Sequence, residues 1–311
     1  MRFQEILGQE VACAQLKRAH AHGRLSHAYI FDGPRGVGKM TTARALAALL
    51  LCDAPEDNDA CGRCAACAQL DSGTHPDCIS VAPDGKSIKI KQIRDLRARL
   101  SNTATYGGYT VVLIDEADTM GIEAANAFLK TVEEPVGPTC FVLVTTQADR
   151  LPDTIRSRAQ LVRFKPLSEA VMLRLLGRDD TDARLAVDLA QGSISRARDI
   201  LADPEARALR QKRRDALWAL LPTLATKHDG ALLRFADDFN ADRDATREEV
   251  LLIRRYWRGQ MNQALENGTD LSAVVRILHL TTTALARLET NTEPSLILGA
   301  LFIEMARALR Q

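Results

Sequence analysis

The sequence predicts an α/β domain built on a parallel sheet, followed by a region made only of helices. Three continuous apolar runs, at 28–31, 111–114 and 140–144, each lead into a turn or into polar residues. This is the pattern of strands that are buried on both faces of a parallel sheet. From Pro204 onward, every segment carries apolar residues at helical spacing, which indicates an all-helical region of roughly a hundred residues.

The composition fits a globular protein of two or three domains. Of the 311 residues, 46% are hydrophobic and 26% are charged, and 41 basic side chains against 40 acidic ones give a net charge of +1. No global field therefore draws the chain to nucleic acid or to an anionic membrane. No apolar stretch reaches the ~18 residues of a membrane span. We expect a cytoplasmic protein with no membrane partner, whose seven cysteines bind metal or pack rather than form disulfides.

A glycine-rich loop follows the first apolar run and precedes a helix-like run at 42–51. A strand, a G-x-x-x-x-G-K loop and a helix in this order form the context of a phosphate-binding loop. Backbone N–H groups converge on the phosphate oxygens, and the lysine reaches the β- and γ-phosphates. The sequence therefore predicts an ATP or ADP site whose loop residues are Gly33, Gly36, Val37, Gly38 and Lys39.

The residue after the lysine departs from the motif. Met40 stands where a Ser or Thr hydroxyl normally binds Mg²⁺, and a thioether has little affinity for a hard cation. Thr41 follows, but a shift of one residue at a helix start turns the side chain by about 100°. Nucleotide binding with Mg²⁺, with Thr41 as the nearest hydroxyl, is predicted, and efficient hydrolysis is not.

Four cysteines follow the loop helix, at Cys52, Cys61, Cys64 and Cys67. Four thiolates, three of them in a C-x2-C-x2-C run, can close a tetrahedral shell around zinc. Such a closed shell has no open position, so the expected role is structural. An iron–sulfur cluster, which can begin with the same run, and four unliganded thiols are the alternatives.

Polar side chains follow the next two apolar runs. Asp115 and Glu116 come directly after 111–114, and Thr146 follows 140–144. Because ligands bind at the carboxyl ends of parallel strands, we expect Asp115 beside Mg²⁺ and Glu116 placed to polarise a water. The Thr146 hydroxyl is predicted to sense the γ-phosphate. An acidic turn that caps a helix, and a threonine at a strand end, are the plainer interpretations.

Two groups of cations have two interpretations each. The run from Lys89 to Arg99 forms a basic helix face, which is either solvated or turned toward DNA. Arg156 and Arg158 lie in a short helix-like segment, where they are surface charges or present a guanidinium to the phosphate of a neighbouring molecule.

With these pieces in order, the chain resembles the bacterial clamp-loader subunits of DNA polymerase III, which are AAA+ proteins. In that family a Ser-Arg-Cys motif supplies an arginine finger to ATP held by the adjacent subunit. Arg158 matches this arginine, and Ala159 replaces the cysteine. The motifs that carry the resemblance are Gly8-Gln9, Leu25-Ser26-His27-Ala28-Tyr29, the four-cysteine insert, Asp115-Glu116-Ala117-Asp118, Asn126-Ala127-Phe128-Leu129-Lys130, Glu133-Glu134-Pro135 and Thr154-Ile155-Arg156-Ser157-Arg158.

The resemblance implies three domains. They are an AAA+ nucleotide-binding domain at 1–166 with a zinc module at about 52–67, a small helical lid at 167–203, and an all-helical collar for oligomerisation at 204–311. It also implies a hetero-pentamer with gamma/tau and delta subunits, which loads a sliding clamp onto primer–template DNA as part of the DNA polymerase III holoenzyme.

Within the family, the ATP-hydrolysing gamma/tau motor and the delta-prime subunit share this layout. Three features favour delta-prime: the chain ends at Gln311 without the long tail of tau, Met40 replaces the magnesium hydroxyl, and Ser195 stands where the motor has a lid arginine. Arg196 comes one step later and is predicted to lie near the nucleotide. Because Lys39, Asp115 and Glu116 are retained, ATP turnover by a gamma/tau-like motor stays the alternative. An AAA+ helicase or helicase loader is disfavoured by the cysteine insert.

Overall fold

The computed structural model describes residues 1–100, 108–133, 135, 137–239, 242–288, 290 and 292–310, without the side chains of 206, 207 and 244. Contacts divide the chain into two compact units, Met1–Ala202 and Asp203–Gln311. Glu134, part of the motif at 133–135, and Gln311 lie outside the described residues. The finer division into three domains stays a prediction.

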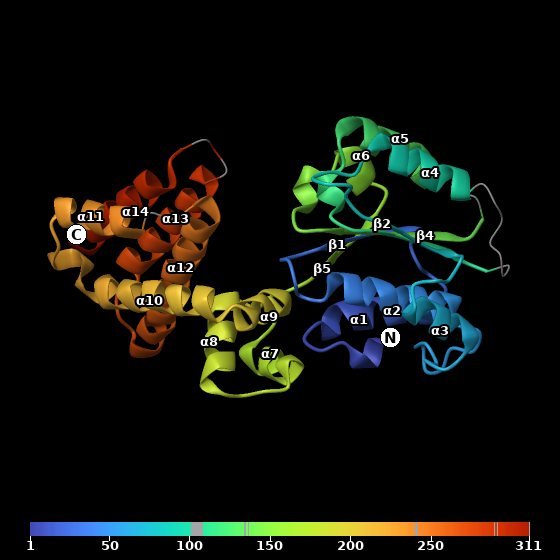
Figure 1. Ribbon diagram of the computed structural model, residues 1–311, viewed down its shortest axis with the longest axis horizontal. Helices are drawn as coiled ribbons and strands as arrows, with labels where there is room; N and C mark the ends of the chain where they lie inside the picture. The colour runs from blue at the N-terminus through green and yellow to red at the C-terminus, as the bar shows by residue number, and fades with distance from the viewer. Residues whose placement is uncertain are drawn as a thin grey trace. The chain divides into compact units, whose positions relative to one another are not determined.

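The first unit is built on a sheet of five parallel strands, which confirms the predicted α/β fold (Figure 1). The spatial order is β2-β3-β4-β1-β5, so the first strand along the chain lies inside the sheet, between β4 and β5. The strands are β1 (Ala28–Asp32), β2 (Cys78–Val81), β3 (Thr110–Ile114), β4 (Thr139–Thr145) and β5 (Gln160–Arg163).

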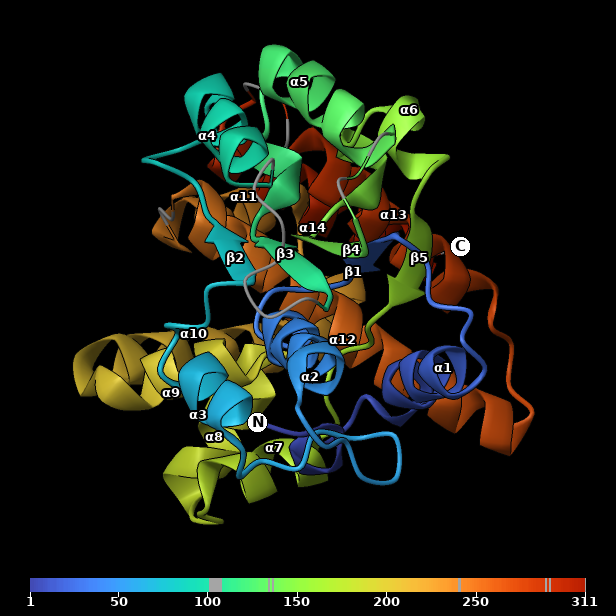
Figure 2. The ribbon, with the colours of Figure 1, turned by 90° about the vertical axis from the view of Figure 1, so that its right-hand side faces the viewer.

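Helices cover both faces of this sheet (Figures 1 and 2). On one face lie α1 (Glu10–Ala21), α2 (Lys39–Leu51) and α3 (Ala65–Asp71), and on the other lie α4 (Ile90–Leu100), α5 (Ile122–Glu133) and α6 (Asp153–Arg156). Successive strand residues feed the two cores alternately, since Ile30 packs in the core that includes Phe128 of α5 and Phe31 packs in the core that includes Leu46 of α2. The apolar runs are continuous because both faces are buried.

Three short helices follow β5 within the first unit: α7 (Glu169–Leu176), α8 (Thr181–Ala190) and α9 (Ile194–Ala202). Each begins at a residue suited to cap a helix. Ser168 and Asp180 accept hydrogen bonds from backbone N–H groups in the first turns of α7 and α8, and Ser193 accepts one from the N–H of Arg196 in α9. The side-chain oxygens satisfy N–H groups that have no partner inside the helix.

The second unit is helical, as the spacing from Pro204 onward predicts. Its core gathers buried apolar residues from every helix, among them Leu217, Leu232, Ile253, Ile277 and Phe302. Among the described residues, no helix is both long enough and apolar enough to cross a membrane. The elements are α10 (Pro204–Leu220), a 3-10 segment η4 (Leu221–Thr226), α11 (Asp229–Phe239), α12 (Arg243–Asn267), α13 (Ser272–Arg287) and α14 (Pro294–Arg310).

Candidate functional site: a phosphate loop, an exposed arginine and a four-cysteine cluster

The glycine-rich loop joins the end of β1 to the start of α2, as predicted. Gly33 has φ +153°, and a Cβ there would lie 2.4 Å from the carbonyl oxygen of Phe164. Gly36 and Gly38 have φ +72° and +101°, in the left-handed region that glycine tolerates. Gly38 is the residue before the first turn of α2, which begins at Lys39, three residues earlier than the run at 42–51 predicts. The loop therefore delivers Lys39 on the first turn of a buried helix.

The Lys39 ammonium is held by the loop itself. Its Nζ donates hydrogen bonds to the carbonyl oxygens of Gly33 and Pro34, both at 2.6 Å, and the residue is only 6% exposed. Burial lowers the pKa of Lys39, while the carboxylates of Asp115, Asp32 and Asp118 act in the opposite direction. The surrounding acidic groups thus favour a charged ammonium at the position where the motif requires one.

The three residues after Lys39 point in different directions. Met40 is partly buried against the core between the sheet and α2, whereas Thr41 is exposed. The Thr42 hydroxyl is buried and donates to the carbonyl oxygen of Gly38 at 2.9 Å. Met40 is thus followed by one exposed hydroxyl and one buried hydroxyl. The predicted role of Thr41 stays a prediction.

Acidic side chains follow β3 at the carboxyl edge of the sheet. The Asp115 carboxylate accepts a hydrogen bond from the Glu116 N–H at 2.9 Å, and Glu116 adopts the left-handed region, with φ +45°. The Glu116 carboxylate pairs with the guanidinium of Arg35, from the phosphate loop, at 3.2 Å. The structure therefore places the predicted water-polarising carboxylate against the loop, in an ion pair that the sequence pattern does not reveal.

The end of β4 reaches the same acidic cluster through Asp118. The Thr145 hydroxyl donates to Asp118 Oδ1 at 2.7 Å, and the Thr146 hydroxyl lies 3.5 Å from Oδ2. Thr146, the predicted γ-phosphate sensor, thus lies at the carboxyl edge of the sheet and contacts a carboxylate. The buried hydroxyl at this point belongs to Thr145, which is 1% exposed.

The start of α9 contacts the phosphate loop. The Ile194 N–H donates to the Gly36 carbonyl oxygen at 2.9 Å. A Cβ at Gly36 would lie 2.1 Å from Ser195 Oγ and 2.3 Å from Ser193 Oγ, so only glycine permits this approach. Arg196, which is predicted to lie near the nucleotide, lies in the first turn of α9, next to the segment that contacts the loop.

A buried glutamine ties the loop to two other segments. Gln9 is 4% exposed, and its Nε2 donates to the carbonyl oxygens of Val37 at 3.0 Å and Lys165 at 2.8 Å. Its Oε1 accepts from the Lys165 N–H at 3.3 Å. The Gln9 side chain therefore joins the loop to the residues that follow β5.

Arg158, the predicted finger, lies just beyond α6 and is about 40% exposed. Its guanidinium contacts Glu133 Oε1, at the end of α5, at 2.7 Å. It also donates to the Thr154 carbonyl oxygen at 3.0 Å and to Ser157 Oγ at 3.4 Å. These contacts hold the guanidinium beside the end of α5, one of the helices on the face of the sheet opposite α2.

The four cysteines come together after α2. Their sulfur atoms all lie within 4.8 Å of one another, and Cys52 Sγ is 3.9 Å from Cys64 Sγ and 3.8 Å from Cys67 Sγ. Four sulfurs bound 2.3 Å from a tetrahedral zinc are about 3.8 Å apart, whereas a disulfide needs about 2.05 Å. The spacing fits a metal shell and excludes disulfide bonds between these pairs.

The environment of the cluster differs from one thiol to another. A backbone N–H group, that of Arg63, lowers the pKa of Cys61 to about 6, and burial raises the pKa of Cys67 to about 12. The backbone hydrogen bond favours the thiolate form of Cys61. Cys67 loses its proton only with strong assistance, such as metal binding. This donor set suits a structural zinc.

The cysteine segment also anchors the start of the chain. Asp59 is 6% exposed, and its carboxylate accepts hydrogen bonds from the backbone N–H groups of Phe3, Gln4 and Ala60 at 2.9–3.0 Å. Charge-assisted hydrogen bonds of this kind are among the stronger ones. Nothing in the spacing of the cysteines indicates this role for Asp59.

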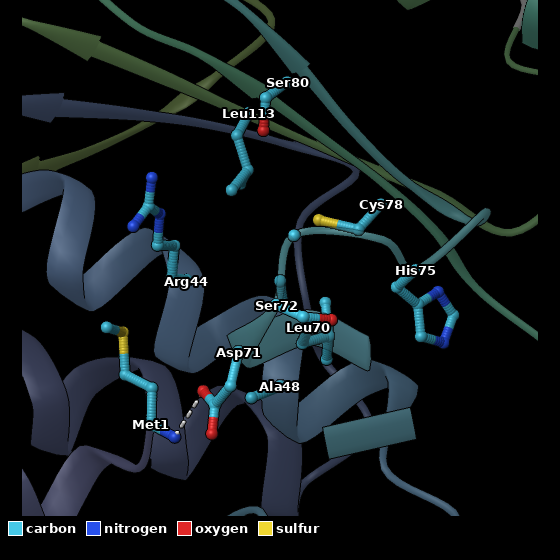
Figure 3. Close-up of a pocket in the computed structure, with 12 residues that line it drawn as sticks. Met1, Arg44, Ala48, Leu70, Asp71, Ser72, His75, Cys78, Ser80 and Leu113 are labelled. Atoms are coloured by element: carbon cyan, nitrogen blue, oxygen red, sulfur yellow. Dashed lines mark hydrogen bonds and ion pairs between the residues drawn. The ribbon is translucent and has the colours of Figure 1, made fainter. Parts of the chain in front are cut away.

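A separate cavity of about 270 Å³ lies beside α2, α3 and β2 (Figure 3). Arg44, Leu70, His75, Cys78 and Ser80 are among the residues that line it. None of the predicted site residues is among its lining residues, since the cavity lies further along α2 than the phosphate loop.

With this geometry in hand, comparisons with known proteins decide the family. The family model described as "DNA polymerase III, delta subunit" matches residues 8–168, just over half of the chain. The chain belongs to this family. The matched region contains the phosphate loop, the acidic edge, the four cysteines and Arg158, which are the residues that carry the resemblance.

Individual relatives agree. The chain is 46% identical over 135 residues to DNA polymerase III subunit delta' of Pseudomonas aeruginosa, covering 43% of this chain and 41% of that protein. It is 43% identical over 157 residues to the delta' subunit of Bacillus subtilis, covering 50% and 47%. It is 36% identical over 175 residues to the tau subunit of B. subtilis, covering 56% and 31%. The chain thus spans less than half the length of these relatives. The comparisons confirm the predicted resemblance to delta-prime subunits and the predicted AAA+ fold.

Proposed function

We propose that this chain acts as the delta-prime subunit of a DNA polymerase III clamp loader. It binds ATP or ADP without efficient hydrolysis, and it supplies Arg158 to the nucleotide of a neighbouring gamma/tau subunit. The observation that carries the proposal is that Arg158 is held at the surface beyond α6, while the chain's own phosphate loop has a core-packed Met40 in place of the magnesium hydroxyl. The chain can therefore complete a neighbour's site better than its own.

The proposed partners follow from the family. They are gamma/tau and delta subunits in a hetero-pentamer, with the sliding clamp and primer–template DNA reached through the assembly, in the cytoplasm. The helices after Asp203 would form the collar, and α7–α9 the lid. A structural zinc would be held by Cys52, Cys61, Cys64 and Cys67, where it would fix the segment between α2 and α3.

The nucleotide would be bound mainly by the loop. Backbone N–H groups of residues 35–38 would contact the phosphates, and Lys39 would exchange its bonds to the Gly33 and Pro34 carbonyl oxygens for bonds to phosphate oxygens. Asp115, Thr41, Thr146 and Arg196 would surround the terminal phosphate, with Mg²⁺ weakly held because Met40 offers no oxygen.

While Glu116 pairs with Arg35, its carboxylate would be engaged with the guanidinium rather than directed at a water. The gamma/tau-like motor stays the second candidate, since Lys39, Asp115 and Glu116 are all in place around the loop.

A reconstituted assay tests the proposal. Purified gamma/tau, delta, sliding clamp and primed DNA are combined with and without this chain, and clamp loading is counted. Loading that depends on this chain, together with no ATP hydrolysis by the chain alone, is the expected result. Substituting Met40→Thr in the isolated chain should increase any residual hydrolysis. Loading that proceeds equally well without the chain would refute the proposal, and strong ATPase activity of the isolated chain would favour the motor.

A further inference from the structure

We infer that Glu133 is a positioning residue for Arg158. It holds the guanidinium in the orientation needed to contact the nucleotide of a neighbouring subunit. This inference rests on the proposed function, because it assigns a partner to the proposed finger. The direct observation is the ion pair between Arg158 and Glu133 Oε1 at 2.7 Å. The two residues are 25 positions apart in the sequence and are brought together by the packing of α5 against α6 (Figures 1 and 2).

The backbone on both sides of Arg158 is fixed. Ile155 is 1% exposed in the core under α5, and Ala159 packs against the same core. The Arg158 N–H donates to the Ile155 carbonyl oxygen at 3.1 Å. With its backbone immobilised, the orientation of the guanidinium depends on the side-chain contacts alone.

Those contacts hold the guanidinium without using all of its hydrogen-bond donors. One terminal nitrogen donates to the Thr154 carbonyl oxygen and to Ser157 Oγ, and the other meets Glu133. An arginine has five N–H donors in a planar fork, so the three contacts found among the described residues leave two donors for a phosphate. A long side chain loses considerable conformational freedom when it is ordered, and Glu133 removes part of that cost before the neighbour arrives.

The position of Glu133 argues against a role in helix stability. It is the last residue of α5, and a carboxylate at a helix C-terminus lies beside the negative end of the helix dipole, where it is destabilising. A nearby arginine offsets this penalty. The ion pair with Arg158, and not helix stability, therefore explains a carboxylate at this position.

The experiment uses the complete reconstituted loader and measures DNA- and clamp-stimulated ATP hydrolysis. The Arg158-dependent rate is the difference between the unaltered complex and the complex with Arg158→Ala. Glu133→Ala should lower this difference by about two- to fivefold, the range that corresponds to an exposed ion pair. The KM for ATP should stay unchanged, because the neighbour's own loop binds the nucleotide, and Glu133→Asp should recover part of the loss.

Two variants separate positioning from a general structural effect. The double variant Glu133→Ala/Arg158→Ala should match Arg158→Ala alone, since Glu133 acts through the arginine. Asp149→Ala breaks the adjacent exposed pair with Arg156, at 2.7 Å, and should leave the rate unchanged.

The outcomes are distinguishable. If Arg158→Ala has no effect, the proposed finger itself is wrong. If Arg158→Ala lowers the rate but Glu133→Ala leaves it unchanged or raises it, Glu133 does not position the arginine, and the inference fails while the proposed function stands. An equal loss with Asp149→Ala would likewise overturn the specific role of Glu133.

Discussion

Replacing Gln9 by alanine should selectively destabilise the first unit. The buried side chain makes three hydrogen bonds, to the Val37 and Lys165 carbonyl oxygens and from the Lys165 N–H. At about 1 kcal/mol of net stability for each bond, the loss is about 3 kcal/mol. For a unit of this size, that corresponds to a fall in the melting temperature of about 6–12 °C.

The distribution of tryptophan makes the assay selective. The chain has two tryptophans, Trp218 in α10 and Trp257 in α12, and both belong to the second unit. Far-ultraviolet circular dichroism follows both units, while tryptophan fluorescence follows the second alone. Gln9→Ala should lower the melting temperature of the transition that only circular dichroism detects. The melting temperature measured by fluorescence should not change.

Gln4→Ala is the matched control, because Gln4 lies in the same segment but is exposed. It should change stability by less than about 0.5 kcal/mol. If Gln9→Ala is as mild as this control, the hydrogen bonds of Gln9 do not hold the loop and the segment after β5 together. If it shifts the fluorescence transition equally, the effect is not confined to the first unit.

Two further predictions concern the cysteine cluster and a buried carboxyl. Removing metal with a chelator should speed amide hydrogen exchange at Phe3 and Gln4, whose N–H groups donate to Asp59, and unchanged exchange would show that the cluster does not anchor this segment. In the second unit, burial raises the pKa of Glu249 to about 8 from 4.5, although Arg213 acts against the shift. Because the pKa is raised on folding, the stabilising contribution is fully present below about pH 4.5 and is lost as the pH rises through 8. The melting temperature measured by fluorescence should therefore fall as the pH rises over this range, and its dependence on pH should be weaker in Glu249→Gln. An unaltered pH dependence in that variant would contradict the assignment.

The strands, most helices and the four-cysteine cluster were accessible to prediction from sequence because their determinants are local. A strand buried on both faces needs a continuous apolar run, as in 111–114, and a tetrahedral metal shell needs ligands at short spacings, as in Cys61-x2-Cys64-x2-Cys67. The start of α2 was missed by three residues, because the glycine conformations that begin the helix at Lys39 are set by the loop and not by apolar periodicity.

The pairings that tune the site could not be predicted, because they join segments far apart in the chain. Nothing in the sequence pairs Arg35 with Glu116 or Arg158 with Glu133, and they become partners only through the strand order and helix packing. The same holds for Gln9, whose Lys165 partner lies 156 residues away.

We propose, above all, that this chain supplies Arg158 to the nucleotide site of a neighbour and does not hydrolyse ATP efficiently at its own site. The most direct measurement is the DNA- and clamp-stimulated ATPase rate of the complete loader carrying, in this chain alone, either Arg158→Ala or Lys39→Ala. We expect Arg158→Ala to lower the rate by more than about twofold, because one finger is lost, and Lys39→Ala to leave the rate unchanged. A loss with Lys39→Ala and none with Arg158→Ala would show that the chain is a motor and that its arginine serves no neighbour.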